Sequence, residues 1–325
     1  MVDIPWDKSC ITASTDDVDY MTSLGLKSNL KTTAEEKLFY YSRGLEDVKP
    51  DTPVLVLLHG YPQTWRHIIP LLPKSIPLFI PDLCGYGRSS PLTTAHNKLA
   101  VGRTLLSTLH SILPSGSTPQ SLILCGHDRG ARIAHRLTVS ARSLPNFTIT
   151  GTILLDIMPT LSQWASGSTP SKSVGFYHWS FLPNVSLATE MILALGGPRY
   201  VESCIQRWAG SGIQTLEQHN AMSVYGRAFS YEHVIRASCE DYRASAFEEV
   251  EEHEGDQRDG RKMEGRVVVG YSKGFLGQRG RVEEWGQWVG EGGRLDFRGF
   301  EGGHFVAEEC PEEVAEMIGE FYGGV

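Results

Sequence analysis

The chain has 325 residues, of which 41% are hydrophobic, and it carries a formal net charge of −8. This length and apolar content allow a large core, so one catalytic domain with an insertion is expected. The acidic balance, with no stripe of Lys and Arg, argues against a nucleic-acid partner. No apolar run approaches the roughly 18 residues of a membrane span.

The N-terminal residues 1–7 are acidic and lack the apolar centre of a signal peptide, which favours a cytoplasmic protein. The six cysteines are scattered without metal-ligand spacing, so we expect reduced thiols and no metal site. They are Cys10, Cys84, Cys125, Cys204, Cys239 and Cys310.

Strand and helix patterns alternate along the first half of the chain, which predicts a mostly parallel sheet with helices on both faces. Residues 1–50 form an N-terminal arm with a strand at about 38–41. Helical patterns such as residues 99–113 separate the later strands. Those strands are predicted near 54–58, 78–81, 121–125 and 148–155.

Strand signals vanish after the sixth strand, and helical patterns rich in Trp, Tyr and Leu replace them. Residues 159–250 are therefore predicted to form a helical insertion, called the cap below. The charged run at 248–262 is predicted to be a solvated loop. We thus expect the core to comprise residues 1–158 and 251–325, with its last strand at 294–299 and a final helix from Pro311.

Residues 122–132 (LILCGHDRGAR) are the most informative stretch, because a buried strand runs there into a turn and then a helix. Gly126 and Gly130 flank Asp128, as in the nucleophile elbow of α/β-hydrolases, where glycines let strand and helix approach closely. A carboxylate at the apex favours displacement at carbon through an aspartyl ester. Asp128 is therefore the predicted nucleophile.

Two further loops follow predicted strands. The sequence HGYP at 59–62 comes directly after the strand at 54–58, and this loop is expected to turn the backbone N–H of Tyr61 towards the elbow. With the N–H of Arg129 it would form an oxyanion hole. The sequence GGHF at 302–305 follows the last strand, which makes His304 the candidate base.

Residues 126–132 with 134–137 (AHRL) resemble the fluoroacetate (haloacetate) dehalogenases of the α/β-hydrolase superfamily. The resemblance extends to 155–160 (LDIMPT), to the cap segments 177–182 (YHWSFL) and 239–244 (CEDYRA), and overall from about residue 53 to 308. It implies an α/β-hydrolase fold with a cap after the sixth strand. It also implies hydrolysis of a short 2-haloacid with water as the only cosubstrate and no cofactor.

Asp156, in the segment that resembles the acid-bearing turn after the sixth strand, is expected to orient His304. The alternative acid position follows the seventh strand, at 271–275, and contains no carboxylate. Arg129 and Arg132 lie three residues apart in the first helical turn, so both are predicted to grip a substrate carboxylate.

The resemblance assigns the departing halide to three cap donors, His178, Trp179 and Tyr242. Fluoride in particular requires several directed donors in a dry pocket. The alternative function is an epoxide hydrolase that uses the same Asp128, His304 and Asp156. In that case Tyr242, with Tyr177 or Tyr225, would protonate the epoxide oxygen.

A catalytically silent binding protein is disfavoured, because a nucleophile, a base and an acid are all present. The expected partner is a small anionic substrate, and neither a nucleic acid nor a membrane is expected to bind. The sequence does not decide between a monomer and a homodimer.

Overall fold

The structure is a computed structural model that describes residues 15–33, 36–114, 116 and 118–324. Its centre is an eight-stranded sheet in the order β1-β2-β4-β3-β5-β6-β7-β8. The pairs β1–β2 and β2–β4 are antiparallel, and the other pairs are parallel. The strands are β1 (Lys27–Thr32), β2 (Lys37–Arg43), β3 (Val54–Leu58), β4 (Leu78–Pro81), β5 (Gln120–His127), β6 (Phe147–Leu155), β7 (Arg266–Ser272) and β8 (Arg294–Phe300). The predicted mostly parallel sheet is confirmed.

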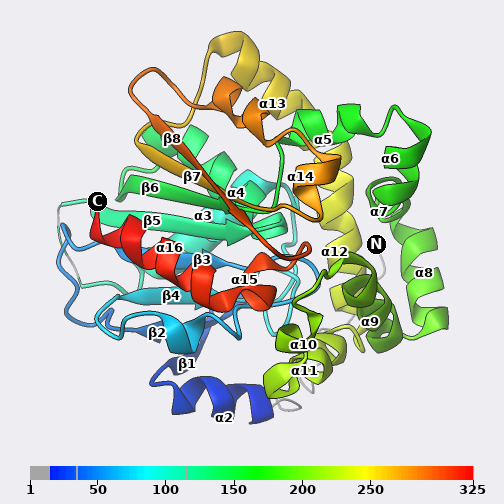
Figure 1. The fold of residues 1–325 in the computed structure, drawn as a ribbon. Helices are drawn as coiled ribbons and strands as arrows, with labels where there is room; N and C mark the ends of the chain where they lie inside the picture. The colour runs from blue at the N-terminus through cyan, green and yellow to red at the C-terminus, as the bar shows by residue number, and fades with distance from the viewer. Residues whose placement is uncertain (1–14, 34–35, 115, 117, 325) are drawn as a thin grey trace.

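Helices cover both faces of this sheet (Figure 1). Outside the cap the helices are α2 (Thr15–Ser23), α3 (Lys98–His110), α4 (Arg129–Val139), α14 (Leu276–Arg279), α15 (Val306–Glu309) and α16 (Pro311–Gly323). Strand β3 shows why two layers form, because all five of its residues are buried. Val54, Val56 and Leu58 belong to the apolar cluster with α3 and α4, whereas Leu55 and Leu57 belong to the cluster with α16. Side chains alternate along a strand, so a wholly apolar strand needs cover on both sides.

Helices α5 to α13 connect β6 to β7; α5 to α12 gather beyond the carboxyl ends of the parallel strands, towards the right of Figure 1, and α13 lies at the top of that view. Their bounds are α5 (Thr160–Ser166), α6 (Pro170–Gly175), α7 (His178–Phe181), α8 (Val185–Leu195), α9 (Gly197–Trp208), α10 (Ile213–Leu216), α11 (Ala221–Ala228), α12 (Glu232–Ala246) and α13 (Glu248–Asp259). The cap therefore lies over the carboxyl ends of the parallel strands, where loops that carry functional residues converge.

The charged run at 248–262 differs from its prediction as a solvated loop, because residues 248–259 form helix α13. Glu249 and Asp256 are buried on this helix, where Glu249 pairs with Lys98 of α3 and Asp256 with Arg136 of α4. These ion pairs join the helix to the core, and two of its eight charged side chains are buried. Helix α13 also crosses the boundary predicted at residue 250.

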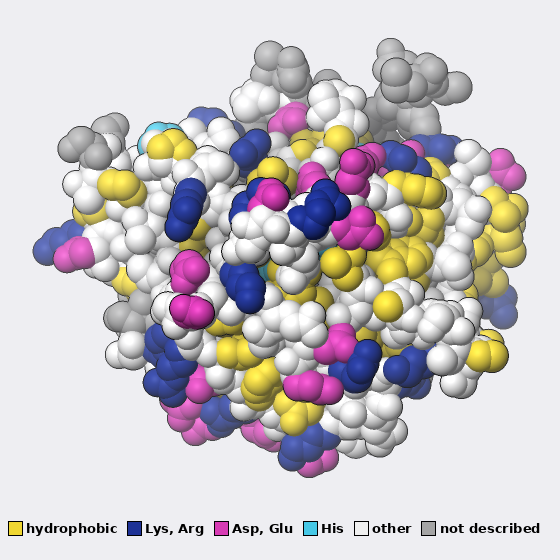
Figure 2. Space-filling view, turned by 90° about the horizontal axis from the view of Figure 1, so that it is seen from above, with side chains coloured by type: hydrophobic (Ala, Val, Ile, Leu, Met, Phe, Trp, Pro, Cys, Tyr) yellow, Lys and Arg dark blue, Asp and Glu magenta, His cyan; other side chains and the backbone are white. Residues whose placement is uncertain are grey.

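The antiparallel edge strand β1 escaped sequence analysis, because its residues KSNLKT are mostly polar and its outer face is exposed. The five described cysteines are buried and form no disulfide; Cys10 lies outside the described residues. In the face that Figure 2 shows, acidic and basic side chains are interspersed. Among the described helices, none is both long and apolar enough to cross a bilayer.

Candidate active site

Asp128 sits at the tip of a tight turn between β5 and α4. Its backbone has φ 45°, a value that side-chain-bearing residues adopt rarely and that Asp and Asn tolerate best. The flanking glycines permit the turn: a Cβ on Gly130 would lie 2.0 Å from Leu58 O, and one on Gly126 would lie 2.4 Å from Ala131 N. The sequence GHDRG therefore forms the predicted elbow.

The register of the parallel strands brings the catalytic loops to one edge. Leu58 pairs with Gly126 and His127 pairs with Leu155, so β3, β5 and β6 end at the same level. Tyr61 N, from the loop after β3, donates to Asp128 Oδ2 over 3.0 Å. Arg129 is the first residue of α4, where a backbone N–H has no partner within the helix. Of the two predicted oxyanion donors, Tyr61 N is thus hydrogen-bonded to the carboxylate of Asp128, and Arg129 N belongs to the next residue of the chain.

His304 and Asp156 form the predicted pair, with 2.7 Å between His304 Nδ1 and Asp156 Oδ2. Asp156 Oδ1 accepts from the backbone N and the hydroxyl of Ser272 over 2.7 and 2.6 Å. Burial lowers the pKa of His304, but the hydrogen bond and charge of Asp156 outweigh burial and raise that pKa above its ordinary value. Ser272, at the end of β7, was not predicted; it occupies the strand end where the sequence offers no carboxylate.

The backbone around His304 is held by groups from both the core and the cap. Gly303 N and Phe305 N donate to the two carboxylate oxygens of Glu309, over 3.0 and 3.1 Å. His304 N donates to Trp208 O of α9 over 2.8 Å. Glu309 Oε2 also accepts from Gly210 N over 2.7 Å. The loop that carries His304 is therefore tied to the α9–α10 connection.

Asp128 is 6% exposed. Burial alone would raise the pKa of its carboxyl group, but His304, Arg129 and other positive neighbours outweigh burial and hold that pKa below its ordinary value. The carboxylate is therefore ionised at neutral pH although little water reaches it. A desolvated, ionised and oriented carboxylate has the properties required of a nucleophile.

A small cavity lies directly over the elbow and is called the elbow cavity below. The space between its wall atoms is about 390 Å³ when its opening to solvent is included. The cavity brings together seven of the predicted side chains with further residues of the cap and of the segment after β7. The predicted ones are Asp128, Arg132, Asp156, His178, Trp179, Tyr242 and His304, and the others include Gln163, Phe176, Trp208 and Phe275.

The two predicted arginines have different partners. Arg129 is fully buried, and its Nε and Nη2 donate to Asp241 Oδ2 and O over 2.7 and 3.0 Å. Its side chain does not line the elbow cavity, and only its Nη1 lacks a partner. Asp241 of α12 therefore holds this guanidinium, and its Nη1 is the one group of Arg129 that remains for a ligand.

Arg132 lines the elbow cavity and contacts only neutral groups. Its Nη1 donates to Thr160 Oγ1 and Met158 O over 2.9 and 3.3 Å, and its guanidinium lies 4.5 Å from the centre of the Trp179 ring. No carboxylate of the described residues forms an ion pair with it. Burial, followed by repulsion from Arg129, lowers the pKa of Arg132 to about 10, so it stays charged at neutral pH.

Four buried nitrogens of the elbow cavity have no hydrogen-bond partner. They are Arg132 Nε, Gln163 Nε2, His178 Nδ1 and Trp208 Nε1. Three are N–H donors in every state, and His178 Nδ1 is a donor in one tautomer. Buried donors without partners are costly, so a ligand rich in acceptors is expected to fill this space. Sequence analysis missed Gln163 and Trp208, which occur in ordinary amphipathic helices.

The predicted halide donors cluster around Tyr242. The rings of Trp179 and His178 lie 5.6 and 5.8 Å from its ring, both edge-on. Burial lowers the pKa of His178 to about 3. Burial and the charge of Asp128 raise the pKa of Tyr242 well above its ordinary value. Both side chains are therefore neutral at pH 7 and offer N–H and O–H groups.

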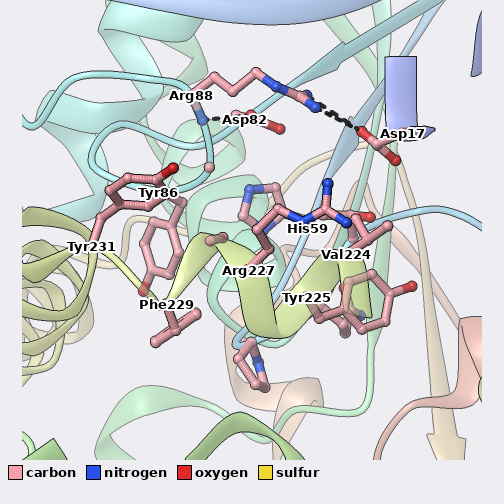
Figure 3. Close-up of a pocket in the computed structure, with 15 residues that line it drawn as sticks. Asp17, His59, Asp82, Tyr86, Arg88, Val224, Tyr225, Arg227, Phe229 and Tyr231 are labelled. Carbon is pink, nitrogen blue, oxygen red and sulfur yellow. Dashed lines mark hydrogen bonds and ion pairs between the residues drawn. The ribbon is translucent and has the colours of Figure 1, made fainter. Parts of the chain in front are cut away.

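Of the three tyrosines considered for an epoxide, only Tyr242 lines the elbow cavity. Tyr225 donates its hydroxyl to Glu308 and lines a second cavity, between α11 and the loops after β3 and β4 (Figure 3). This second cavity is larger, at about 650 Å³ with its opening to solvent included, but Asp128 and His304 do not line it. Polar side chains in its wall bind protein groups, as Arg88 and Asp17 do in Figure 3. The elbow cavity is therefore the candidate active site.

Comparison with known proteins supports the assignment of the fold. A fluoroacetate dehalogenase from a Burkholderia species is 26% identical over 277 residues, which cover 83% of this chain and 86% of the relative. A soluble epoxide hydrolase from Corynebacterium sp. strain C12 is 26% identical over 284 residues, covering 82% and 89%. A solved Pseudomonas aeruginosa structure, provisionally named an epoxide hydrolase, superposes with a TM-score of 0.78 at 26% identity and covers 92% of this chain and 96% of its own.

The family model described as the alpha/beta hydrolase family matches residues 55–317, which include the elbow, the cap and His304. The chain is a hydrolase that belongs to the alpha/beta hydrolase family and is related to both dehalogenases and epoxide hydrolases.

Proposed function

We propose that this hydrolase uses Asp128 to displace halide from a short 2-haloacid through an ester intermediate. The observation that supports this most is Arg132, a buried cation with no acidic partner, in the same small cavity as the ionised Asp128. Asp128 acts on Arg132 through its charge and not through a hydrogen bond, so a substrate carboxylate would be the first acidic group to accept hydrogen bonds from this buried guanidinium. A neutral epoxide would leave Arg132 unpaired.

In the first step, Asp128 Oδ1 attacks the carbon that bears the halogen, and the carbon–halogen electron pair leaves with the halide. Asp128 Oδ2, which accepts from Tyr61 N, becomes the carbonyl oxygen of the new ester. The halide departs towards the donors of His178, Trp179 and Tyr242. These donors are fixed before the reaction, so stabilising the developing charge requires little reorganisation.

In the second step, His304 takes a proton from water, and the hydroxide attacks the ester carbon of Asp128. The oxyanion forms at Oδ2, next to Tyr61 N, and its collapse breaks the bond to the substrate oxygen. This oxygen takes the proton from the His304 imidazolium and leaves as the hydroxyl of a 2-hydroxyacid, and Asp128 returns to the carboxylate by losing one proton to solvent. The bond between His304 Nδ1 and Asp156 Oδ2 leaves Nε2 for the proton transfer and stabilises the imidazolium.

The alternative function, epoxide hydrolysis, uses the same Asp128, His304 and Asp156. Purified enzyme incubated with chloroacetate, fluoroacetate and styrene oxide distinguishes the two. Halide release from the acids without diol formation is expected. Formation of a diol from styrene oxide, with no halide released from any haloacid, would reject the dehalogenase and support the epoxide hydrolase that uses the same Asp128.

Replacing Arg132 by Lys should lower kcat/KM for chloroacetate, with a loss of transition-state stabilisation of about 1.5–3 kcal/mol. Lys keeps the positive charge but lacks the planar fork of N–H donors. The neutral chloroacetamide should not share this loss. Steady-state kinetics with both substrates measure the difference. An equal loss with both would show that Arg132 has a structural role and does not bind a carboxylate.

Asp156→Asn should slow turnover by about a hundredfold or more, because the imidazole loses its orienting carboxylate. Burial would then act on His304 without the opposing charge of Asp156, so the pKa of His304 should fall. In the wild type, activity declines as the pH falls through this raised pKa. The acid limb of the kcat profile should therefore move to lower pH in the variant; an unchanged limb would exclude His304 as the group that titrates.

A further inference from the structure

We propose that Gln163 forms the second half of the carboxylate site, with its amide Nε2 donating to one substrate oxygen while Arg132 Nε donates to the other. This inference rests on the proposed function and deepens it, because it names the residues that select an acid over a neutral analogue. The family resemblance pointed to Arg129 for this position.

Gln163 lies in helix α5 of the cap and is 6% exposed. Its side chain lines the elbow cavity, and its Nε2 has no hydrogen-bond partner. A primary amide that is buried without an acceptor loses its hydrogen bonds to water and gains none from the protein, which costs free energy. Because the side chain lines the elbow cavity, we expect a ligand in this cavity to accept a hydrogen bond from Gln163 Nε2.

Arg132 and Gln163 are brought to the same wall by helix α5. Arg132 Nη1 donates to Thr160 Oγ1, and Thr160 precedes Gln163 by three residues. Residues three apart on a helix lie on one face, about 5–6 Å apart at Cβ. Gln163 is therefore a neighbour of the group that holds the guanidinium, and a carboxylate has two oxygens with which to accept from both side chains.

Helix α5 is itself held in place, which makes Gln163 a fixed donor. The next residue, Trp164, donates its indole N–H to Ser245 O over 2.9 Å. Its ring also packs edge-on against Trp179 at 5.1 Å between centroids. A donor on an anchored helix loses little entropy when the ligand binds.

Charge pairing explains why the second arm is an amide and not Arg129. Asp241 accepts from both Arg129 and Lys98, and Lys98 also pairs with Glu249. Two cations thus meet two carboxylates in this buried group, and Arg129 keeps only its Nη1 without a partner. Arg132 is the cation of the cavity wall that has no acidic hydrogen-bond partner, and Gln163 adds a directed donor without adding charge.

Three variants test the proposal. Gln163→Met keeps the length but removes the donor, and Gln163→Glu keeps the shape but adds a negative charge. Ser162→Ala is the matched control, because Ser162 is on the same helix but does not line the elbow cavity. The readouts are chloride release from chloroacetate and from neutral chloroacetamide, and binding of unreactive acetate followed by tryptophan fluorescence, since Trp179 and Trp208 line the cavity.

We expect Gln163→Met to weaken acetate binding and raise KM for chloroacetate about ten- to a hundredfold, the usual range for a hydrogen bond to a charged group. Gln163→Glu should weaken both further, yet retain turnover of chloroacetamide, and Ser162→Ala should behave as wild type. Wild-type acetate binding in Gln163→Met would overturn the inference even if the haloacids are substrates. If the wild type releases no halide but binds acetate, and Gln163→Met weakens this binding, then the proposed reaction is wrong and the carboxylate site at Gln163 is retained.

Discussion

Asp128→Asn should abolish turnover, with a loss on the order of 10⁴- to 10⁶-fold, because an amide cannot form the ester. The substitution should leave the fold intact. Asn tolerates the φ of 45° at this position, and its side-chain oxygen can still accept from Tyr61 N. Halide release under saturating substrate is the measurement.

Two controls make the Asp128→Asn result interpretable. Circular dichroism and thermal unfolding should match those of the wild type, and the intact mass should exclude deamidation back to Asp. Residual activity near that of the wild type, with the amide intact, would remove Asp128 as the nucleophile.

His304→Gln should allow ester formation but slow its hydrolysis by about 10²- to 10⁴-fold, because general-base assistance to water is lost. A covalent adduct on the enzyme should then accumulate during incubation with chloroacetate. Intact-mass spectrometry should detect the added carboxymethyl group, and peptide mapping should place it on Asp128. The loop should persist, since His304 N donates to Trp208 O through the backbone.

The Asp128→Asn and His304→Gln double variant is the matched control for the adduct, because it should carry none. Halide should be released once per His304→Gln molecule in a burst, with little afterwards. A variant that still turns over slowly without any adduct would show that His304 acts before the ester or not at all.

The elbow and the sheet were accessible from the sequence because each depends on a local rule, whereas Asp156 was found through the family resemblance. Gly126 and Gly130 specify the turn at Asp128, and apolar runs such as Val54–Leu58 specify buried parallel strands. Parallel strands end at one edge of a sheet, so the loops after β3, β5 and β6 had to meet. That is why Tyr61 N contacts Asp128 across 67 residues of sequence.

The cap contacts were not accessible in the same way, because they depend on how the helices pack. Gln163 and Trp208 occur in helical patterns that serve equally well for packing, and only the assembled cavity shows their unpartnered nitrogens. The pair between Arg129 and Asp241 joins residues 112 positions apart. Helix α13 was missed because a run of charges suggests solvent, whereas ion pairs to Lys98 and Arg136 bury its inner face.

The most direct test of the central claim is a single turnover of chloroacetate by excess wild-type enzyme in heavy-oxygen water. The ester mechanism predicts that the heavy oxygen enters the carboxylate of Asp128, because hydroxide attacks the ester carbon there, and that the first glycolate carries none. Mass spectrometry of the Asp128 peptide and of the product measures both. Heavy oxygen in the first glycolate, with Asp128 unlabelled, would show direct attack by water and contradict the covalent mechanism.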